Sequence, residues 1–231
     1  MQILFEDKDL IVVKKEAGIA TQTAKLGEKD LVSEIKNHIH DENPRQREPY
    51  LGVIHRLDQP VEGILVFAKT PEAAKNLGLQ LQEGAMTKEY MAVVCGKVEP
   101  GIHTLVDYLK KDARTNTSSV AQPNAKGAKR AELTYQEYEN RNPSLDYIRN
   151  RSEIKSELHL VKIHLYTGRH HQIRVQMANA GMPLLGDRKY GKSVEGYTGS
   201  INLCAYHLIF RHPRTKKEME FRVIPTNLQI L

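Results

Sequence analysis

The stretch GVIHRLDQPVEGILVFAK, residues Gly52–Lys69, constrains the fold most strongly. It places His55, Arg56 and Asp58 in a short polar loop that follows one apolar segment and precedes a second, Ile64–Ala68. Apolar runs of this length predict buried strands. A loop that is fixed at both ends by core strands holds its side chains rigidly, and functional residues often lie in such loops. This loop is therefore the first candidate for a functional site.

Short apolar runs elsewhere in the chain predict further strands. An example is residues 88–98, where Tyr90, Ala92 and Val94 alternate with Met91, Val93 and Cys95. Strict alternation is typical of a strand whose two faces differ in burial. The other expected strands are residues 3–5, 10–13, 131–138, 157–166, 203–210 and 219–223, and the pair around the polar insertion 140–156 predicts a long hairpin.

Helical spacing occurs in three shorter segments. Residues 29–40 carry Leu31, Ile35 and Ile39 on one face after a capping residue, Asp30. Thr70-Pro71 begins a second helix that Gly84 ends, and residues 172–180 form a third that Gly181 ends. Strands outnumber helices and are joined mostly by turns, so we expect an α+β protein with a mixed, largely antiparallel sheet.

Composition and charge set broader limits on function. The 231 residues carry a formal net charge of +6, which favours a polyanionic partner. The segment 109–129 is polar and basic without periodicity, and we expect it to be exposed. No secretory signal and no apolar run of ~18 residues is present, so a cytoplasmic location is predicted. Cys95 and Cys204 lie in expected strands without CxxC spacing and are predicted to be free thiols.

Four side chains lie where an expected element meets a loop: Asp58, Tyr90, Arg169 and Arg174. An aspartate near an arginine stays ionised and can act as a nucleophile or base at neutral pH. Other roles are open for each residue. Asp58 could cap its own turn before a proline, Tyr90 could be a core aromatic, and the arginines could be solvated or form structural ion pairs.

Cofactor and metal motifs are missing from the sequence. His164, His170 and His171 lie close together, but no HExxH or cysteine–histidine spacing accompanies them. The chain also lacks a GxxxxGK[ST] loop, a GxGxxG turn and a GxSxG elbow. We therefore predict neither a metal nor a cofactor.

Several motifs together resemble one known family, the RluA-type pseudouridine synthases. The signature loop is HRLD followed by a short run, a glycine and an apolar strand. Segments that resemble other family motifs follow in the family's order: ILFEDKDLIVVKKEAG, KEYMAVVCG, GAKRAELTY, TGRHHQIRVQMANAGMPLLGDRKYG and LCAYHLIFRHPRT. The resemblance covers nearly the whole chain. It implies a single catalytic domain over residues 1–231, with a central sheet in two halves and a catalytic cleft between them.

The resemblance implies that uridine in ribosomal or transfer RNA is isomerised to pseudouridine: the C1′–N1 bond breaks, the uracil turns, and C5 joins C1′. Asp58 matches the catalytic aspartate, Tyr90 the tyrosine against the base, and Arg174 the arginine that pairs with the aspartate. The expected substrate-binding residues are Arg56, which can help to displace the base, Leu203 in the uracil pocket, His55 and Arg169. The reaction is redox neutral and releases nothing, so it requires no cofactor.

Two positions depart from the family pattern. Val61-Glu62 replaces a common Thr-Ser pair, and Glu16 replaces the proline of an early Lys-Pro-x-Gly pattern. Glu62 could face away from Asp58, pair with a basic residue, or alter substrate choice. Larger members carry an N-terminal S4 domain, whereas this chain begins with the catalytic opening, and we expect a monomer. A non-catalytic RNA-binding protein or RNA chaperone on the same scaffold is the alternative, and a nucleosidase ranks below it because no second carboxylate is placed as a partner acid.

Overall fold

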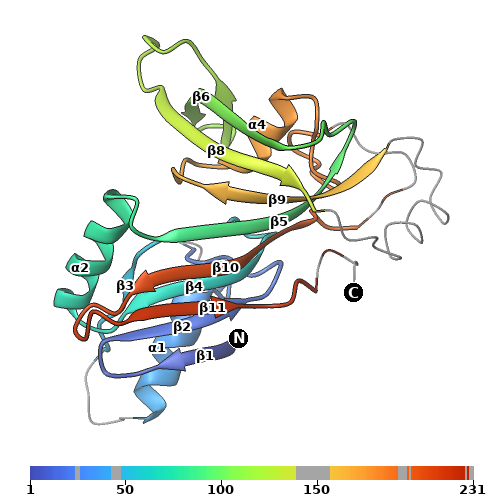
Figure 1. Ribbon diagram of the computed structural model, residues 1–231. Coiled ribbons are helices and arrows are strands. Elements are labelled where there is room, and N and C mark those ends of the chain that lie inside the picture. Colours follow the sequence, from blue (N-terminus) through green and yellow to red (C-terminus); the bar gives the residue numbers. More distant parts are fainter. Residues whose placement is uncertain are drawn as a thin grey trace. The chain divides into compact units, whose positions relative to one another are not determined.

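A computed structural model describes residues 1–23, 27–42, 48–138, 157–191, 197, 199–226 and 228. The chain divides into two compact units (Figure 1). The first comprises Met1–Thr87 and Ala205–Ile224, and the second comprises Lys88–Cys204 and Pro225–Leu231. The expectation of one domain over residues 1–231 stays a prediction. The polar insertion expected at 140–156 lies outside the described residues.

The first unit is built on a buried pair of strands. Its elements are β1 (Gln2–Glu6), β2 (Leu10–Lys15), α1 (Leu31–Glu42), β3 (Gly52–Val53), β4 (Glu62–Ala68), α2 (Pro71–Gln82), β10 (Leu203–Arg211) and β11 (Glu218–Arg222). The strand order is β1-β2-β4-β10-β11, and β3 also pairs with β4. Every residue of β4 is buried, which explains its continuous apolar sequence. Apolar side chains of β2, β4 and β10 form the core together with α2.

Glycine is required at the start of β4. Gly63 has a φ of +134°, and a Cβ atom built there would lie 2.4 Å from the carbonyl oxygen of Ala205 in β10. No side chain fits at that distance, so β4 and β10 can approach this closely only because position 63 has none.

Both helices of the first unit begin as the sequence predicts. The Ser33 amide donates to Asp30 Oδ1 over 2.7 Å, and the Ala73 amide donates to Thr70 Oγ1 over 3.2 Å. These side chains satisfy amide groups that have no partner within the helix. The two predicted caps are therefore confirmed.

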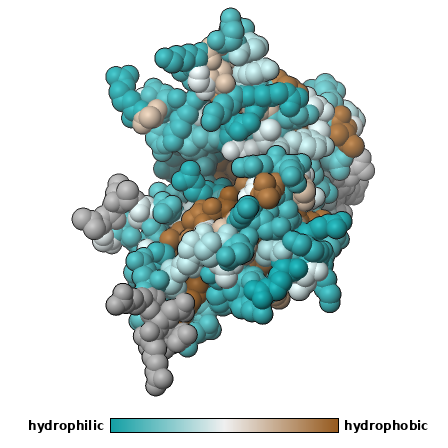
Figure 2. Space-filling view, turned by 90° about the vertical axis from the view of Figure 1, so that its left-hand side faces the viewer, coloured by the Kyte–Doolittle hydropathy of each residue, from teal (hydrophilic) through white to brown (hydrophobic). Residues whose placement is uncertain are grey.

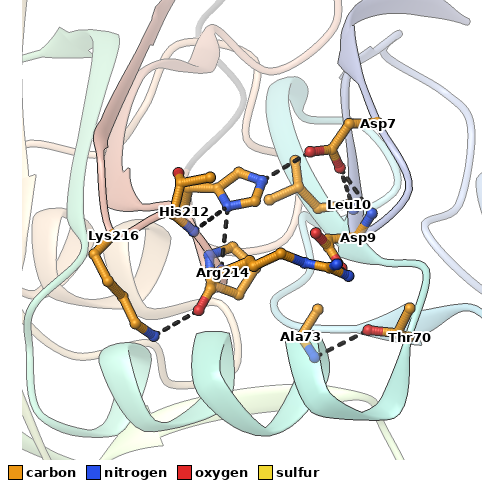
Figure 3. Close-up of polar contacts among 10 residues, drawn as sticks. Asp7, Asp9, Leu10, Thr70, Ala73, His212, Arg214 and Lys216 are labelled. Carbon is orange, nitrogen blue, oxygen red and sulfur yellow. Dashed lines mark hydrogen bonds and ion pairs between the residues drawn. The ribbon is translucent and has the colours of Figure 1, made fainter.

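Two turns of the first unit are joined by a polar cluster (Figure 3). Asp7, between β1 and β2, accepts hydrogen bonds from the amides of Asp9 and Leu10. His212, after β10, donates from Nε2 to Asp7 Oδ2 over 2.8 Å, because its Nδ1 accepts from two backbone amides. Arg214 forms an ion pair with the buried Asp9. The basic turn of the closing hairpin therefore holds the first hairpin in place.

The second unit is an antiparallel sheet with one helix. Its elements are β5 (Thr87–Cys95), β6 (Ile102–Asp112), β7 (Thr117–Val120), β8 (Lys129–Glu137), β9 (Leu158–Leu165) and α4 (Gln172–Asn179). The order is β5-β9-β8-β6-β7, and every neighbouring pair in it is antiparallel. The predicted pairing of β8 with β9 is confirmed. Apolar side chains of β6 and β8 pack against Val175 of α4.

Strands β6 and β7 were missed by sequence reasoning. The expected irregular segment 109–129 contains the end of β6, all of β7 and the first residue of β8. Its residues are mostly exposed, as predicted, but backbone pairing on both edges of β6 makes them strands. Only one residue of β6, Leu109, is buried, so the strand lacks the regularly spaced buried apolar positions by which a strand is recognised in a sequence.

Surface and cysteine predictions can be compared directly with the structure. Most of the face shown in Figure 2 is hydrophilic, with apolar side chains in narrow bands. Both cysteines are buried and free, as expected. In the described ranges, no helix has the length and apolar character needed to span a membrane. The strand-rich α+β class, with mostly antiparallel pairing, is confirmed.

Candidate active site

Backbone and side-chain hydrogen bonds hold the loop between β3 and β4 in one conformation. The Leu57 amide donates to Thr21 Oγ1 over 3.2 Å, and the Thr21 hydroxyl donates to the Leu57 carbonyl over 3.0 Å. The Val61 amide donates to the Asp58 carbonyl over 3.0 Å, which closes a turn. Leu57 is buried whereas Asp58 is half-buried. The predicted rigid platform around Asp58 is therefore present in the first unit.

A fully buried lysine, Lys15, lies beside this loop. Its ammonium group donates to the carbonyl oxygens of Glu16 (2.9 Å), Ile19 (2.6 Å) and Gln59 (3.1 Å). Burial lowers the pKa of Lys15 to about 8, although the negative charges of Asp58 and Glu62 raise it. Sequence reasoning missed this residue, and the available signal was a lysine at the end of a buried strand.

Glu62 does not face solvent. Its side chain is buried, lies 3.9 Å from Lys14 Nζ and interacts electrostatically with Lys15. Of the roles considered for this unusual residue, pairing with basic side chains is the one that the structure supports. Its charge is therefore offset within the first unit by two neighbouring lysines.

The remaining residues of the HRLD motif differ in their surroundings. The Val66 amide of β4 donates to His55 Nε2 over 3.4 Å, so that nitrogen is unprotonated in this contact. Arg56 is exposed, and its guanidinium is accessible to a ligand. His55 thus braces the loop against β4, and Arg56 is the residue that reaches outward.

The second unit holds Arg174 in a fixed orientation. Arg174, on α4, donates from Nε to Asp187 Oδ2 over 2.9 Å and from Nη2 to Asp187 Oδ1 over 2.8 Å. Its guanidinium carbon lies 5.2 Å from the centre of the Tyr190 ring. Burial raises the pKa of Asp187, but hydrogen bonds and the charge of Arg174 outweigh it, so the pKa is lowered. A bidentate pair of this kind fixes the plane of the guanidinium.

Tyr190, which lies against the Arg174 guanidinium, is itself held by strand β7 and by the start of α4. Its hydroxyl oxygen accepts from the Ser118 amide of β7 over 2.7 Å and lies 2.6 Å from His171 Nδ1. His171 adopts a left-handed conformation with a φ of 54° immediately before the helix. Asp187 and Tyr190 were also missed, because their partners are distant along the chain, although both belong to the quoted motif LGDRKYG.

The other predicted site residues are also in the second unit. Tyr90 lies in β5 opposite Ile163 of β9, and only 6% of its surface is exposed. Leu203 is buried and begins β10, whose first two residues belong to the second unit. Arg169 is exposed in the turn before α4, and its Nε donates to the Arg130 carbonyl over 2.8 Å. Tyr90 therefore shares a unit with Arg169, Arg174 and Leu203, and its predicted combination with Asp58 stays a prediction.

Two groups of titratable side chains in the described ranges have spacings that suit a metal ion: Glu6, His38 and Glu42, and Asp7, Asp9 and His212. Each group already contains a cation, because Lys69 Nζ lies 2.5 Å from Glu6 Oε1 and Arg214 pairs with Asp9. Both nitrogens of His212 also have partners. In both groups a cationic side chain therefore already neutralises one of the carboxylates that a metal ion would need.

Known proteins match the chain over most of its length. A family described as RNA pseudouridylate synthase matches residues 9–179. An uncharacterized RNA pseudouridine synthase of Aquifex aeolicus is 33% identical over 232 residues, which cover 96% of this chain and 69% of that protein. Ribosomal large subunit pseudouridine synthase D of Zymomonas mobilis is 30% identical, with 100% of this chain and 71% of that protein covered.

A solved structure supports the fold. Human RNA Pseudouridylate Synthase Domain Containing 4 superposes with a TM-score of 0.76 at 19% identity, covering 98% of this chain and 90% of that one. At this identity the likeness concerns the fold alone. The sequence matches carry the assignment, and they agree with the resemblance identified from the HRLD loop. The chain therefore belongs to the RNA pseudouridylate synthase family.

Proposed function

We propose that this member of the family isomerises uridine to pseudouridine in RNA, with Asp58 as the catalytic carboxylate. The observation that carries the proposal is the position of Asp58, half-buried in a hydrogen-bonded loop beside the ammonium of Lys15. A carboxylate that is fixed in this way can attack C1′, attack the uracil ring, or take the proton from C2′. Each route cleaves the C1′–N1 bond before C5 joins C1′.

Tyr90 and Arg174 have separate roles in the proposed reaction. The Tyr90 ring stacks on the extruded uracil, and base stacking of this kind contributes about 1 to 3 kcal/mol. Its hydroxyl assists removal of the C5 proton, directly or through water. To Arg174, whose orientation is fixed by Asp187, we assign the role that the resemblance implies, which is to keep the catalytic aspartate ionised. These roles rest on the family resemblance together with the anchoring of each side chain within its own unit.

The proposed substrate is ribosomal or transfer RNA. Relatives named as ribosomal large subunit pseudouridine synthases favour the ribosomal choice. The net charge of +6 suits phosphate contacts, which position RNA without specifying its sequence. We assign substrate binding to the exposed Arg56 and the neighbouring His55 in the first unit, and to Arg169 and Leu203 in the second. We also propose a monomer that acts in the cytoplasm.

The test is pseudouridine mapping of total RNA from cells with and without the gene, rescued by wild type, Asp58→Ala or Asp58→Asn. We expect one or a few uridines to lose modification in the deletion strain and regain it only with wild type. RNA affinity should change by no more than a few fold in both variants. Full rescue by either variant would reject Asp58 as the catalytic group, and unchanged maps in all strains would favour the non-catalytic RNA-binding alternative.

A further inference from the structure

Two cations of the second unit, Lys88 and Arg169, lie close together, and neither pairs with a carboxylate of the residues that the structure describes. Lys88 in β5 is 7% exposed, and a Cβ atom built on Gly168 would lie 4.0 Å from its ammonium nitrogen. Arg169 follows Gly168 in the same turn and repels Lys88 electrostatically. Within the ranges that the structure describes, neither Lys88 nor Arg169 forms an ion pair. Buried ammonium groups are usually paired, so this arrangement requires an explanation.

Carboxylates near these cations have other partners. Glu89 follows Lys88 in β5 and therefore points to the opposite face, where it accepts from Lys162 Nζ over 2.9 Å. Glu132 of β8 forms an ion pair with Arg130. Burial and the charge of Arg169 both lower the pKa of Lys88, and no anion of the described residues is among the causes that act on it.

The turn that carries Arg169 is rigid and leaves part of the guanidinium accessible. Gln172 Oε1 accepts from the Arg169 amide over 2.9 Å and from the Thr167 hydroxyl over 2.8 Å. Arg169 Nε donates to the Arg130 carbonyl. Among the described residues, no acceptor binds the terminal nitrogens of this guanidinium, so they can donate to an anion that arrives from solvent.

We propose that Lys88 and Arg169 bind one phosphodiester group of the RNA, next to the nucleoside that Tyr90 contacts. Lys88 and Tyr90 are two residues apart in β5, so both side chains point to the same face, about 7 Å apart along the strand. The planar guanidinium and the compact ammonium are complementary donors for the two non-bridging oxygens of a phosphate. The inference rests on the proposed function, because it takes RNA as the ligand.

Salt dependence of RNA binding provides the test. Binding is measured by fluorescence anisotropy between 50 and 200 mM KCl. The probe is a transcript around the uridine that the mapping identifies, or a 30-nucleotide uridine-containing hairpin if none is identified. We expect Lys88→Met to weaken binding roughly tenfold and to reduce the slope of log K against log[salt] by about 0.7, the value for one single-strand phosphate contact. Lys88→Arg should restore most of the slope, which a merely structural role would not require.

Lys97→Met is the matched control, because Lys97 is exposed in the same unit and already pairs with Glu99. Its slope should equal that of wild type. A series of probes with single methylphosphonate substitutions then identifies the phosphate. At one position the substitution should weaken binding to wild type most, and should weaken binding to Lys88→Met and to Arg169→Gln less, because each variant has already lost one of the two donors to that phosphate. Equal RNA slopes for wild type and Lys88→Met would overturn the proposal. This holds even if inorganic phosphate binds to wild type. Binding needs no turnover, so a catalytically inactive wild type would refute the proposed function and leave this measurement valid.

Discussion

The most quantitative prediction concerns Lys15 and the dependence of stability on pH. An ordinary lysine has a pKa of 10.5, and burial lowers that of Lys15 to about 8 in the folded protein. Between these two pH values the unfolded chain binds one more proton than the folded protein at this position. The free energy of unfolding therefore rises with pH in this window, by about 1.36 kcal/mol per pH unit.

The full effect is the difference of about 2.5 pKa units multiplied by that slope, or about 3.4 kcal/mol. Lys15→Met removes the titrating group and keeps a long side chain in the cavity. We expect the stability of wild type, measured relative to this variant, to be constant below about pH 7, to increase above pH 8 and to level off above 10.5. Urea unfolding at half-unit pH intervals measures the difference, and most other titrating groups cancel between the two proteins.

The variant also loses three hydrogen bonds to backbone carbonyls. That loss lowers its stability at every pH and does not change the shape of the difference curve. Lys8→Met is the control for the change of side chain itself, because Lys8 is exposed. A flat difference curve between pH 7 and 10 for Lys15→Met would refute the prediction that burial of Lys15 outweighs the opposing charges of Asp58 and Glu62.

Three other substitutions test separate parts of the structure. Asp187→Asn should destabilise the protein by about 3 kcal/mol, because it removes the charge that is paired with the buried Arg174; a urea midpoint equal to that of wild type would contradict this. Gly63→Ala should cost more than about 2 kcal/mol in a thermal unfolding assay, since its Cβ meets the Ala205 backbone at 2.4 Å, and an unchanged Tm would mean that β4 and β10 can separate without cost. Tyr90→Phe should preserve RNA affinity and slow single-turnover pseudouridine formation, and equal rates would exclude the hydroxyl from proton transfer.

Local features of the fold could be predicted because their causes are close together in the sequence. The caps at Asp30 and Thr70 act three residues away, and β4 is recognisable from its continuous apolar run. The same holds for the polar loop that carries Asp58, which lies directly before that strand. Each inference used only the chemistry of adjacent residues, and the structure confirms each one.

Other features depend on contacts that no local pattern reveals. Asp187 fixes Arg174 from 13 residues away, and His212 reaches Asp7 across 205 residues. Only Leu109 of strand β6 is buried, so its sequence does not show the buried apolar positions that identify a strand. Burial of Lys15 also escapes prediction, because the neighbouring Lys14 has the same side chain and only the fold decides which of the two points inward.

The surroundings of two buried lysines, Lys15 and Lys88, indicate that they have different roles. Three carbonyl oxygens surround Lys15, and Asp58 and Glu62 add negative charge, so the protein itself offsets part of the cost of burying its ammonium. Lys88 is almost as deeply buried, but the charge that acts on its pKa is the guanidinium of Arg169, which lowers it further. Folding alone gains nothing from bringing two like charges together, and the cost is recovered only when an anion binds. Lys15 therefore belongs to the framework of the catalytic loop, whereas Lys88 is expected to serve the RNA.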